Sequence, residues 1–135
     1  MSHFTTVKTK INSLASLQKT LDRMNLPYRV AEEGQGVEIR GYRGQTMKAE
    51  VAIDMGKYDI GVVKAEDGNY TLVADWWGIE VTRGKTEKEL IEEVNREYAY
   101  VRIVEACEAQ GYQIAKDDIQ VGEDGTVQLV ATKWG

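Results

Sequence analysis

The residues on which many catalytic and metal sites depend are scarce in this sequence. Among 135 residues there is one cysteine, one histidine and one proline. A single cysteine excludes an internal disulfide, which agrees with a reducing compartment. A single histidine is too few for the usual zinc sites, and His3 lies at the chain terminus, where side chains are seldom ordered. We therefore predict no metal, no cofactor and no catalytic residue.

Phosphate-binding loops are missing as well. The glycines at 34, 36, 41 and 44 fit neither the Walker pattern nor a dinucleotide fingerprint, so they predict turns. Arg40, Arg43 and Lys48 lie close by and give a weak signal for anion binding. Cys107 continues the apolar stripe of a predicted helix, between two glutamates, and is expected to be an inert core residue.

Long hydrophobic runs are also absent. No stretch approaches the roughly 18 apolar residues of a membrane span. No apolar segment follows a basic start, so the sequence lacks the pattern of a secretory signal. We expect a cytoplasmic protein without a membrane span. The length fits a single domain, which we place over residues 1–135.

The net charge of −5 is unevenly distributed along the chain. Residues 1–64 carry 10 basic and 7 acidic residues, whereas residues 65–135 carry 7 and 15. The acidic balance disfavours nucleic acid as a partner. The basic N-terminal stretch permits two interpretations, a small anion-binding face or a solvated surface of mixed charge, and we favour the second.

Hydrophobic periodicity predicts two helices. Leu14, Leu17, Leu21 and Met24 recur at helical spacing after a cap at Asn12 or Ser13, and Pro27 ends that helix. The second helix is predicted over 87–110. Its start is a capping box of Thr86 and Glu89, and its end is Gly111 at the position after the C-cap.

Alternating residues predict short strands between and after the helices. These strands cover residues 4–11, 28–30, 37–39, 49–55, 60–63, 70–74, 119–121 and 127–131. Strands and helices do not alternate, which argues against a doubly wound parallel sheet. We predict an α+β fold with a mainly antiparallel sheet, two helices packed on one face and a partly open opposite face.

One segment occurs twice. Residues 62–78, VVKAEDGNYTLVADWWG, match residues 119–135, IQVGEDGTVQLVATKWG, at 8 of 17 positions. Either a hairpin is duplicated, or two hairpins converge on the same Asp-Gly turn chemistry. We favour a repeated hairpin, because the shared Trp-Gly lies outside the turn.

The string Asp75-Trp76-Trp77-Gly78 is the most suggestive segment for function. As part of a strand, Trp76 and Trp77 would point to opposite faces, so that one enters the core and the other is exposed. Exposed tryptophans are enriched at binding hot spots. The alternative is that Trp77 only covers the end of the sheet. We name Trp76 and Trp77 as candidate binding residues, and Arg43 and Asp75 as candidates for a nearby cleft.

Several unusual strings follow one another in a fixed order. They are VEIRGYRGQT at 37–46, YDIG at 58–61, LVADWW at 72–77, NREYAY at 95–100 and EDGTVQLVATKW at 123–134. Over almost its whole length the chain resembles the hypothetical chloroplast reading frame 35 family, also called domain of unknown function 1257. The resemblance implies a protein of cyanobacteria or red-algal-type plastids, cytoplasmic or stromal, and implies no activity.

Three hypotheses about function follow. We favour a non-enzymatic accessory protein that binds a protein partner in assembly or regulation. The alternative is a small-molecule (anion) binder, or an enzyme of unrecognised type, with a cleft near Arg43, Asp75 and Trp77. Nucleic-acid binding by the basic N-terminal stretch is the least favoured.

Overall fold

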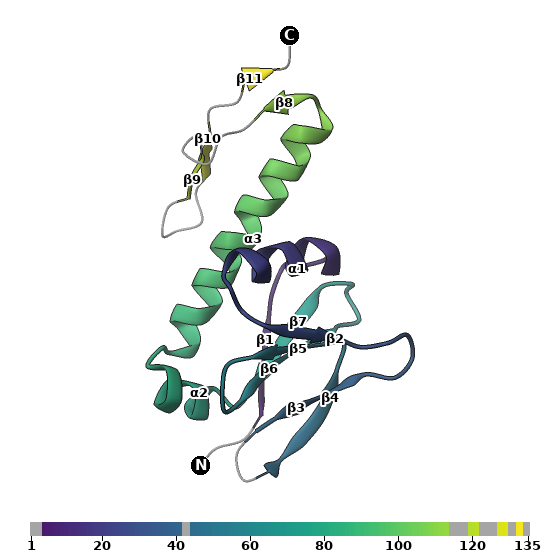
Figure 1. The fold of residues 1–135 in the computed structure, drawn as a ribbon, viewed down its shortest axis with the longest axis vertical. Helices are drawn as coiled ribbons and strands as arrows, with labels where there is room; N and C mark the ends of the chain where they lie inside the picture. Colours follow the sequence, from purple (N-terminus) through teal and green to yellow (C-terminus); the bar gives the residue numbers. More distant parts are fainter. Residues whose placement is uncertain (1–3, 42–43, 114–118, 122–126, 130–131, 134–135) are drawn as a thin grey trace.

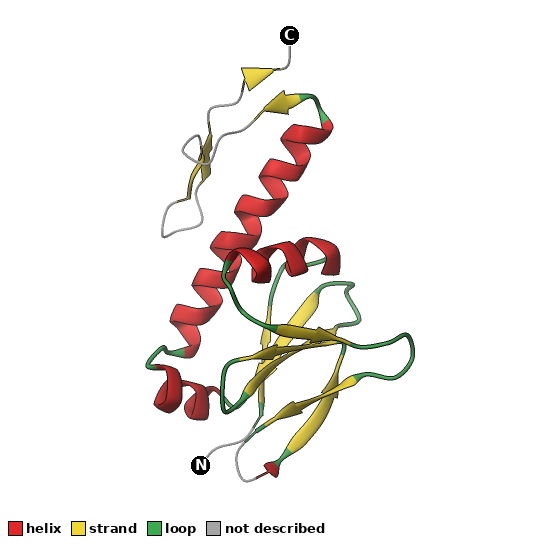
Figure 2. Cartoon of the chain, in the orientation of Figure 1, coloured by secondary structure: helices red, strands yellow, loops and turns green. Residues whose placement is uncertain are grey.

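A sheet of five antiparallel strands lies at the centre of the fold (Figures 1 and 2). The computed structural model describes residues 4–41, 44–113, 119–121, 127–129 and 132–133. The strands stand in the order β1-β7-β6-β5-β2. Their bounds are Thr5–Lys8 (β1), Tyr28–Val30 (β2), Val51–Asp54 (β5), Asp59–Lys64 (β6) and Tyr70–Ala74 (β7).

Helices and shorter strand pairs complete the described part of the chain. The helices are Leu14–Arg23 (α1), Trp76–Arg83 (α2) and Glu87–Ala109 (α3). The remaining strands pair as β3 with β4, β8 with β11 and β9 with β10. They span Val37–Arg40 (β3), Thr46–Ala49 (β4), Tyr112–Gln113 (β8), Ile119–Val121 (β9), Val127–Leu129 (β10) and Thr132–Lys133 (β11). In Figure 1, β8, β9, β10 and β11 lie beside the outer half of α3, away from the sheet.

The predicted α+β fold with a mainly antiparallel sheet is confirmed, but several elements differ from the prediction, among them the short strands β8 and β11, which were not predicted. The described part of the chain has three helices rather than two, because residues 76–83 form α2. The predicted strand over 49–55 is broken by a bend at Glu50. Ala49 is therefore the last residue of β4, which pairs with β3, and Val51 is the first residue of β5 in the main sheet.

The main core joins the central strands to all three helices. Several residues of this cluster, from α1, α2 and the strands, are fully buried: Leu17, Leu21, Val51, Ile53, Val62, Leu72 and Ile79. The helix α3 contributes Leu90, Val94 and Tyr98. Alternate residues of each strand share a face, so the period-two pattern of the sequence supplies this core. The sheet and helices are held together chiefly by apolar burial.

The β3–β4 hairpin packs on the other face of the sheet, where the sequence predicted a partly open surface. Ile39 and Ala49 of the hairpin form a second buried cluster with Ala52 of β5. Small residues on the sheet permit this approach, since a Cβ on Gly61 would lie only 2.8 Å from Ile39 Cδ1. Part of the predicted open face is therefore covered.

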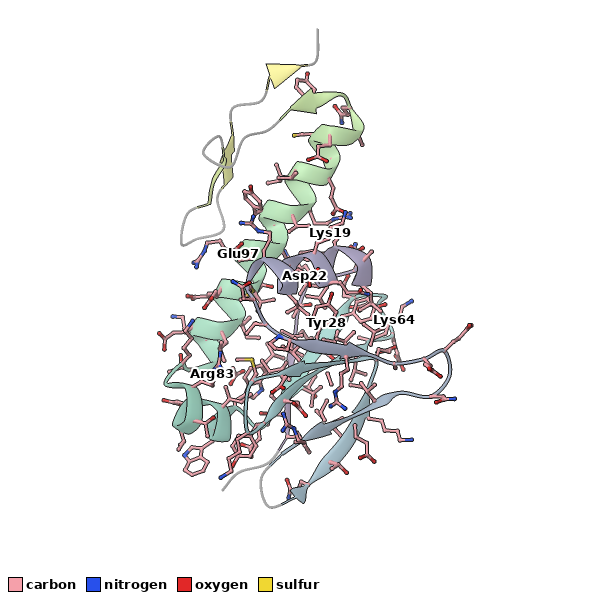
Figure 3. All side chains as sticks on the ribbon, viewed as in Figure 1. Lys19, Asp22, Tyr28, Lys64, Arg83 and Glu97 are labelled. Carbon is pink, nitrogen blue, oxygen red and sulfur yellow. The ribbon has the colours of Figure 1, made fainter. Side chains whose placement is uncertain are left out.

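Two ion pairs join α1 to α3, and Figure 3 labels one residue of each pair, Lys19 and Glu97. Lys19 Nζ lies 2.8 Å from Glu105 Oε2, and Arg23 Nη2 lies 3.0 Å from Glu97 Oε2. The Arg23 guanidinium also lies 3.8 Å from the centroid of the Tyr100 ring. Basic residues of the N-terminal half are thus neutralised in part by acidic residues of the C-terminal half.

The predicted starts of the two helices are confirmed, whereas α1 already ends at Arg23, before Pro27, and α3 ends at Ala109, one residue before the predicted end. Ser13 caps α1, and Thr86 and Glu89 form the capping box of α3. Gly111 follows the C-cap with a left-handed φ of 84°. At about 1.5 Å per residue, the 23 residues of α3 extend about 35 Å, past α1 and the sheet (Figure 1). Cys107 lies on that outer part and is half-buried rather than a core residue.

The two segments of the proposed repeat have the same strand register. Lys64 pairs with Tyr70 in β6–β7, and the equivalent Val121 pairs with Val127 in β9–β10. The matching Trp134 and Gly135 lie outside the described residues. Duplication of the hairpin stays a prediction.

Candidate functional site

Residues 75–83 form a capped helix, so the prediction of a strand through Trp76 and Trp77 is wrong. The carboxylate of Asp75 caps α2, because its Oδ1 accepts a hydrogen bond of 3.1 Å from the Gly78 N–H. Gly84 ends the helix with a φ of 74°. The strand β7 stops at Ala74, and the chain turns into α2 at once.

The inner face of α2 is fixed against the rest of the fold. We define this face by Trp76, Gly78 and Ile79. Trp76 is 5% exposed, and its Nε1 donates a hydrogen bond of 3.0 Å to the Thr5 carbonyl oxygen in β1. Gly78 lies beneath the Tyr58 ring, where an added Cβ would stand 2.8 Å from Cε2. These contacts leave α2 little freedom to shift.

The outer face of α2 presents apolar side chains to solvent. We define it by Trp77, Glu80 and Val81, which a helix of 3.6 residues per turn places on one side. Trp77 is 58% exposed and Val81 is 64% exposed. Val30, on the edge strand β2, is the one other exposed large hydrophobic side chain in the described part of the chain. Exposed apolar residues therefore gather on α2.

This arrangement suits binding to another surface. Tryptophan offers a large contact area with few rotatable bonds, and rigid aromatic side chains dominate binding hot spots. A helix that is capped, anchored and packed beforehand loses little further conformational entropy when a partner docks. The outer face can therefore make apolar contacts with another molecule, and the Glu80 carboxylate lies beside those contacts.

The four residues singled out from the sequence do not share one environment. Trp76 supports the fold, whereas Trp77 is exposed, which agrees with the expectation that one enters the core and the other does not. Asp75 is 1% exposed and serves the helix cap. Arg43 lies outside the described residues. A cleft formed with Arg43 stays a prediction.

Arg40, considered for anion binding, is engaged by carboxylates of its own chain. Its Nη2 lies 2.7 Å from Asp59 Oδ1 and 3.0 Å from Asp54 Oδ1. The hydrogen bond to Asp59 raises the pKa of Arg40. Burial alone would raise the pKa of Asp59, but the side-chain and backbone hydrogen bonds from Arg40 and the charges of Arg40 and Arg29 lower it. This cluster fastens β3 to the sheet.

The described residues provide little for metal chemistry or membrane insertion. Within them, His, Cys, Asp and Glu side chains form no group of three or more that could hold a metal ion. None of the helices in that part of the chain is long and apolar enough to cross a bilayer. The surface on α2 thus remains the strongest candidate site.

Comparison with known proteins identifies the family. The model of a family described as "Protein of unknown function (DUF1257)" matches residues 20–130. The chain belongs to this family. The resemblance stated from the sequence strings is thereby confirmed.

Several relatives match this chain over almost their whole length. "Uncharacterized protein ycf35" of Cyanophora paradoxa is 27% identical over 137 residues, covering 99% of this chain and 98% of the relative. The proteins of the same name from Guillardia theta and Pyropia yezoensis are 27% and 26% identical, with the same coverage. No solved structure matches the chain. These names assign no activity to the relatives.

Sequence reasoning missed part of the outer face. Val81 and Glu80 were not singled out, because the chain after Gly78 was not assigned to a helix. A signal was present: Asp75 is a good N-cap, Trp76 and Ile79 have helical spacing, and Gly84 is a good helix end. Once residues 76–83 are helical, Trp77 and Val81 must be neighbours.

Proposed function

We propose that the protein is a non-enzymatic accessory factor that binds a protein partner through the outer face of α2. One observation carries the proposal. Trp77 and Val81 lie exposed, one turn apart, on a helix held in place by its inner face. Assembly or regulation in the cytoplasm or stroma is the role that such a factor would serve.

The chemistry of the outer face suggests what the partner presents. Glu80 stands beside Trp77 and Val81 and is exposed, so a complementary partner offers an apolar side chain next to a lysine or arginine. Two side chains on a helix of 8 residues make a small patch. A stable dimer needs about 800 Å² from each partner, so we favour a short segment of another protein over a second copy.

The partly neutralised N-terminal half supports a protein rather than a nucleic acid as partner. Lys19 and Arg23 are both paired with glutamates of α3. Nucleic-acid affinity depends on several unpaired lysine or arginine side chains, which bind the phosphates and release their counterions. The acidic net charge of −5 works in the same direction.

The test is affinity purification from cells that naturally make the protein. Tagged wild type is compared with Trp77→Ala/Val81→Ser and with Val30→Ser, which removes an exposed hydrophobic residue elsewhere. We expect a stoichiometric protein that the wild type and Val30→Ser recover and the α2 variant loses. Recovery of no partner, or equal recovery by all three, would overturn the proposal.

A further inference from the structure

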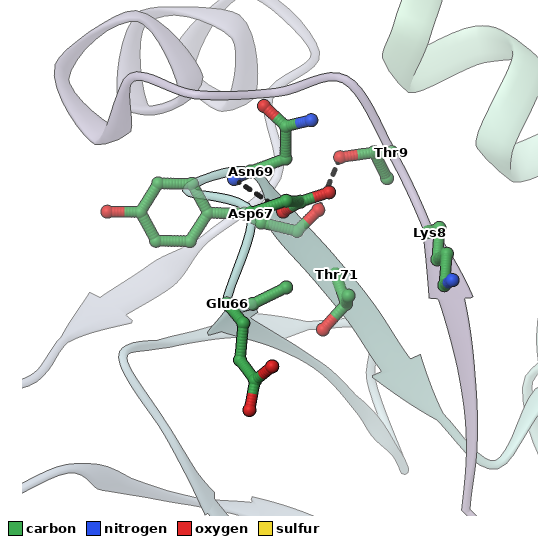
Figure 4. A pocket seen from close by; sticks show the side chains of 8 residues that line it. Lys8, Thr9, Glu66, Asp67, Asn69 and Thr71 are labelled. Carbon is green, nitrogen blue, oxygen red and sulfur yellow. Dashed lines mark hydrogen bonds between the residues drawn. The ribbon is translucent and has the colours of Figure 1, made fainter.

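A pocket of about 290 Å³, partly open to solvent, lies between the end of β1 and the turn that joins β6 to β7 (Figure 4). None of the residues that define the outer face of α2 lines it, so it is independent of the proposed function. The labelled residues around it are Lys8, Thr9, Glu66, Asp67, Asn69 and Thr71.

Hydrogen bonds fix the shape of this cavity. The Tyr70 N–H donates a hydrogen bond of 2.7 Å to the Ile11 carbonyl oxygen, and the Thr9 hydroxyl donates to the Tyr70 carbonyl oxygen. These bonds fasten the chain after β1 to the start of β7. In the turn, the Asn69 N–H donates a hydrogen bond of 2.9 Å to Asp67 Oδ1. Both walls are therefore held in place before any ligand arrives.

Side chains of opposite charge line the cavity without neutralising one another. Lys8 belongs to β1, whereas Glu66 and Asp67 belong to the turn. Among the residues that the structure describes, none of these three takes part in an ion pair. A simple anion at Lys8 would be repelled by two carboxylates, and a simple cation would be repelled by Lys8. A ligand that carries one negative and one positive group can pair with Lys8 and with the two carboxylates at the same time.

We propose that this cavity binds a free amino acid as its zwitterion, with the carboxylate toward Lys8 and the ammonium toward Glu66 and Asp67. The size of the cavity agrees with this class of ligand. Pockets for small molecules start at about 300 Å³, so a volume of about 290 Å³ suits a ligand as small as an amino acid. The side-chain amide of Asn69 offers a further donor and acceptor at the wall.

Amide NMR titrations of the full-length protein test the proposal, with each free L-amino acid added alone. We expect saturable shifts at Thr9 and at residues 66–71 with one or a few amino acids. The deaminated and the decarboxylated analogue of the best binder should each bind about tenfold more weakly, because each loses one charge-assisted contact. Absence of shifts with every amino acid, or equal binding of either analogue, would overturn the proposal.

Matched variants identify the charges responsible. Lys8→Met and Glu66→Gln should each weaken the best binder by about tenfold. Lys10→Met is the control, because Lys10 is exposed and does not line the cavity. Circular dichroism checks that the variants fold, which is expected since Lys8 and Glu66 are exposed. Equal affinity of Lys8→Met and wild type would refute the assignment of the carboxylate to Lys8.

Discussion

The inner and outer faces of α2 each carry a tryptophan, and these two neighbouring residues lie in different environments. Trp76 is 5% exposed and bonded to β1, whereas Trp77 is 58% exposed. About 100° of helical rotation separates the two side chains. The direction of the side chain, rather than the residue type, therefore decides which tryptophan is buried in the fold and which is exposed on its surface.

Removal of Trp76 should have the largest effect. Trp76→Ala is expected to lower the free energy of unfolding by about 4 kcal/mol, because it leaves a large cavity and removes the donor to the Thr5 carbonyl oxygen. Urea unfolding followed by circular dichroism measures the change. Trp76→Phe is the control, since it keeps most of the packing. A variant Trp76→Ala as stable as wild type would contradict the assignment of the inner face.

A methyl group on Gly78 should have the next largest effect. Gly78→Ala is expected to lower the free energy of unfolding by about 2 kcal/mol, since the new Cβ would stand 2.8 Å from the Tyr58 ring. Thermal and urea unfolding measure it. In a Tyr58→Leu background the same change should be neutral or stabilising, because alanine favours a helix over glycine by about 1 kcal/mol. Equal losses in both backgrounds would exclude the ring contact as the cause.

Loss of the helix cap should have a smaller effect. Asp75→Ala is expected to lower the free energy of unfolding by about 1 kcal/mol, because the Gly78 N–H loses its acceptor. Asp75→Asn keeps an acceptor at the same place and should retain more of the stability. Urea unfolding compares the two variants, and an Asn variant no better than Ala would show that the cap is not what Asp75 contributes.

Removal of Trp77 should have the smallest effect on stability. Trp77→Ala is expected to change the free energy of unfolding by less than about 0.5 kcal/mol, because the side chain is exposed. The same variant should weaken partner binding by about 2 kcal/mol or more, as a hot-spot residue does. Unfolding and binding measured on one preparation separate the two. A large loss of stability would erase the distinction between the faces.

Local signals in the sequence predicted much of the fold. The first cap, which was narrowed to Asn12 or Ser13, the capping box at Thr86 and Glu89 and the helix end at Gly111 each depend on a few neighbouring residues. The turn of β6–β7 was also predicted, with Gly68 at a φ of 87°. Patterns of this kind act through bonds within one or two turns of chain, so they can be read without tertiary structure.

Features that depend on distant residues were missed. The β3–β4 hairpin covers the sheet because Gly61 leaves space for Ile39, and nothing near Gly61 in the sequence indicates that neighbour. Trp76 and Trp77 favour strands as residue types, and Gly78 weakens a helical pattern, so the two tryptophans were assigned to a strand and the residues after Gly78 to no element. The cap at Asp75 and the end at Gly84 are local signals for this helix, and the contacts with Tyr58 and Thr5 add to them in the folded chain.

The contact between α1 and α3 has a consequence for how the chain folds during synthesis. The Tyr98 hydroxyl accepts a hydrogen bond from the Asn12 N–H, 86 positions earlier in the chain. Leu17 and Leu21 of α1 are buried in a cluster that α3 completes. When α1 leaves the ribosome, the residues that bury it have not yet been made. We therefore expect folding to finish late, and only after most of α3 has emerged.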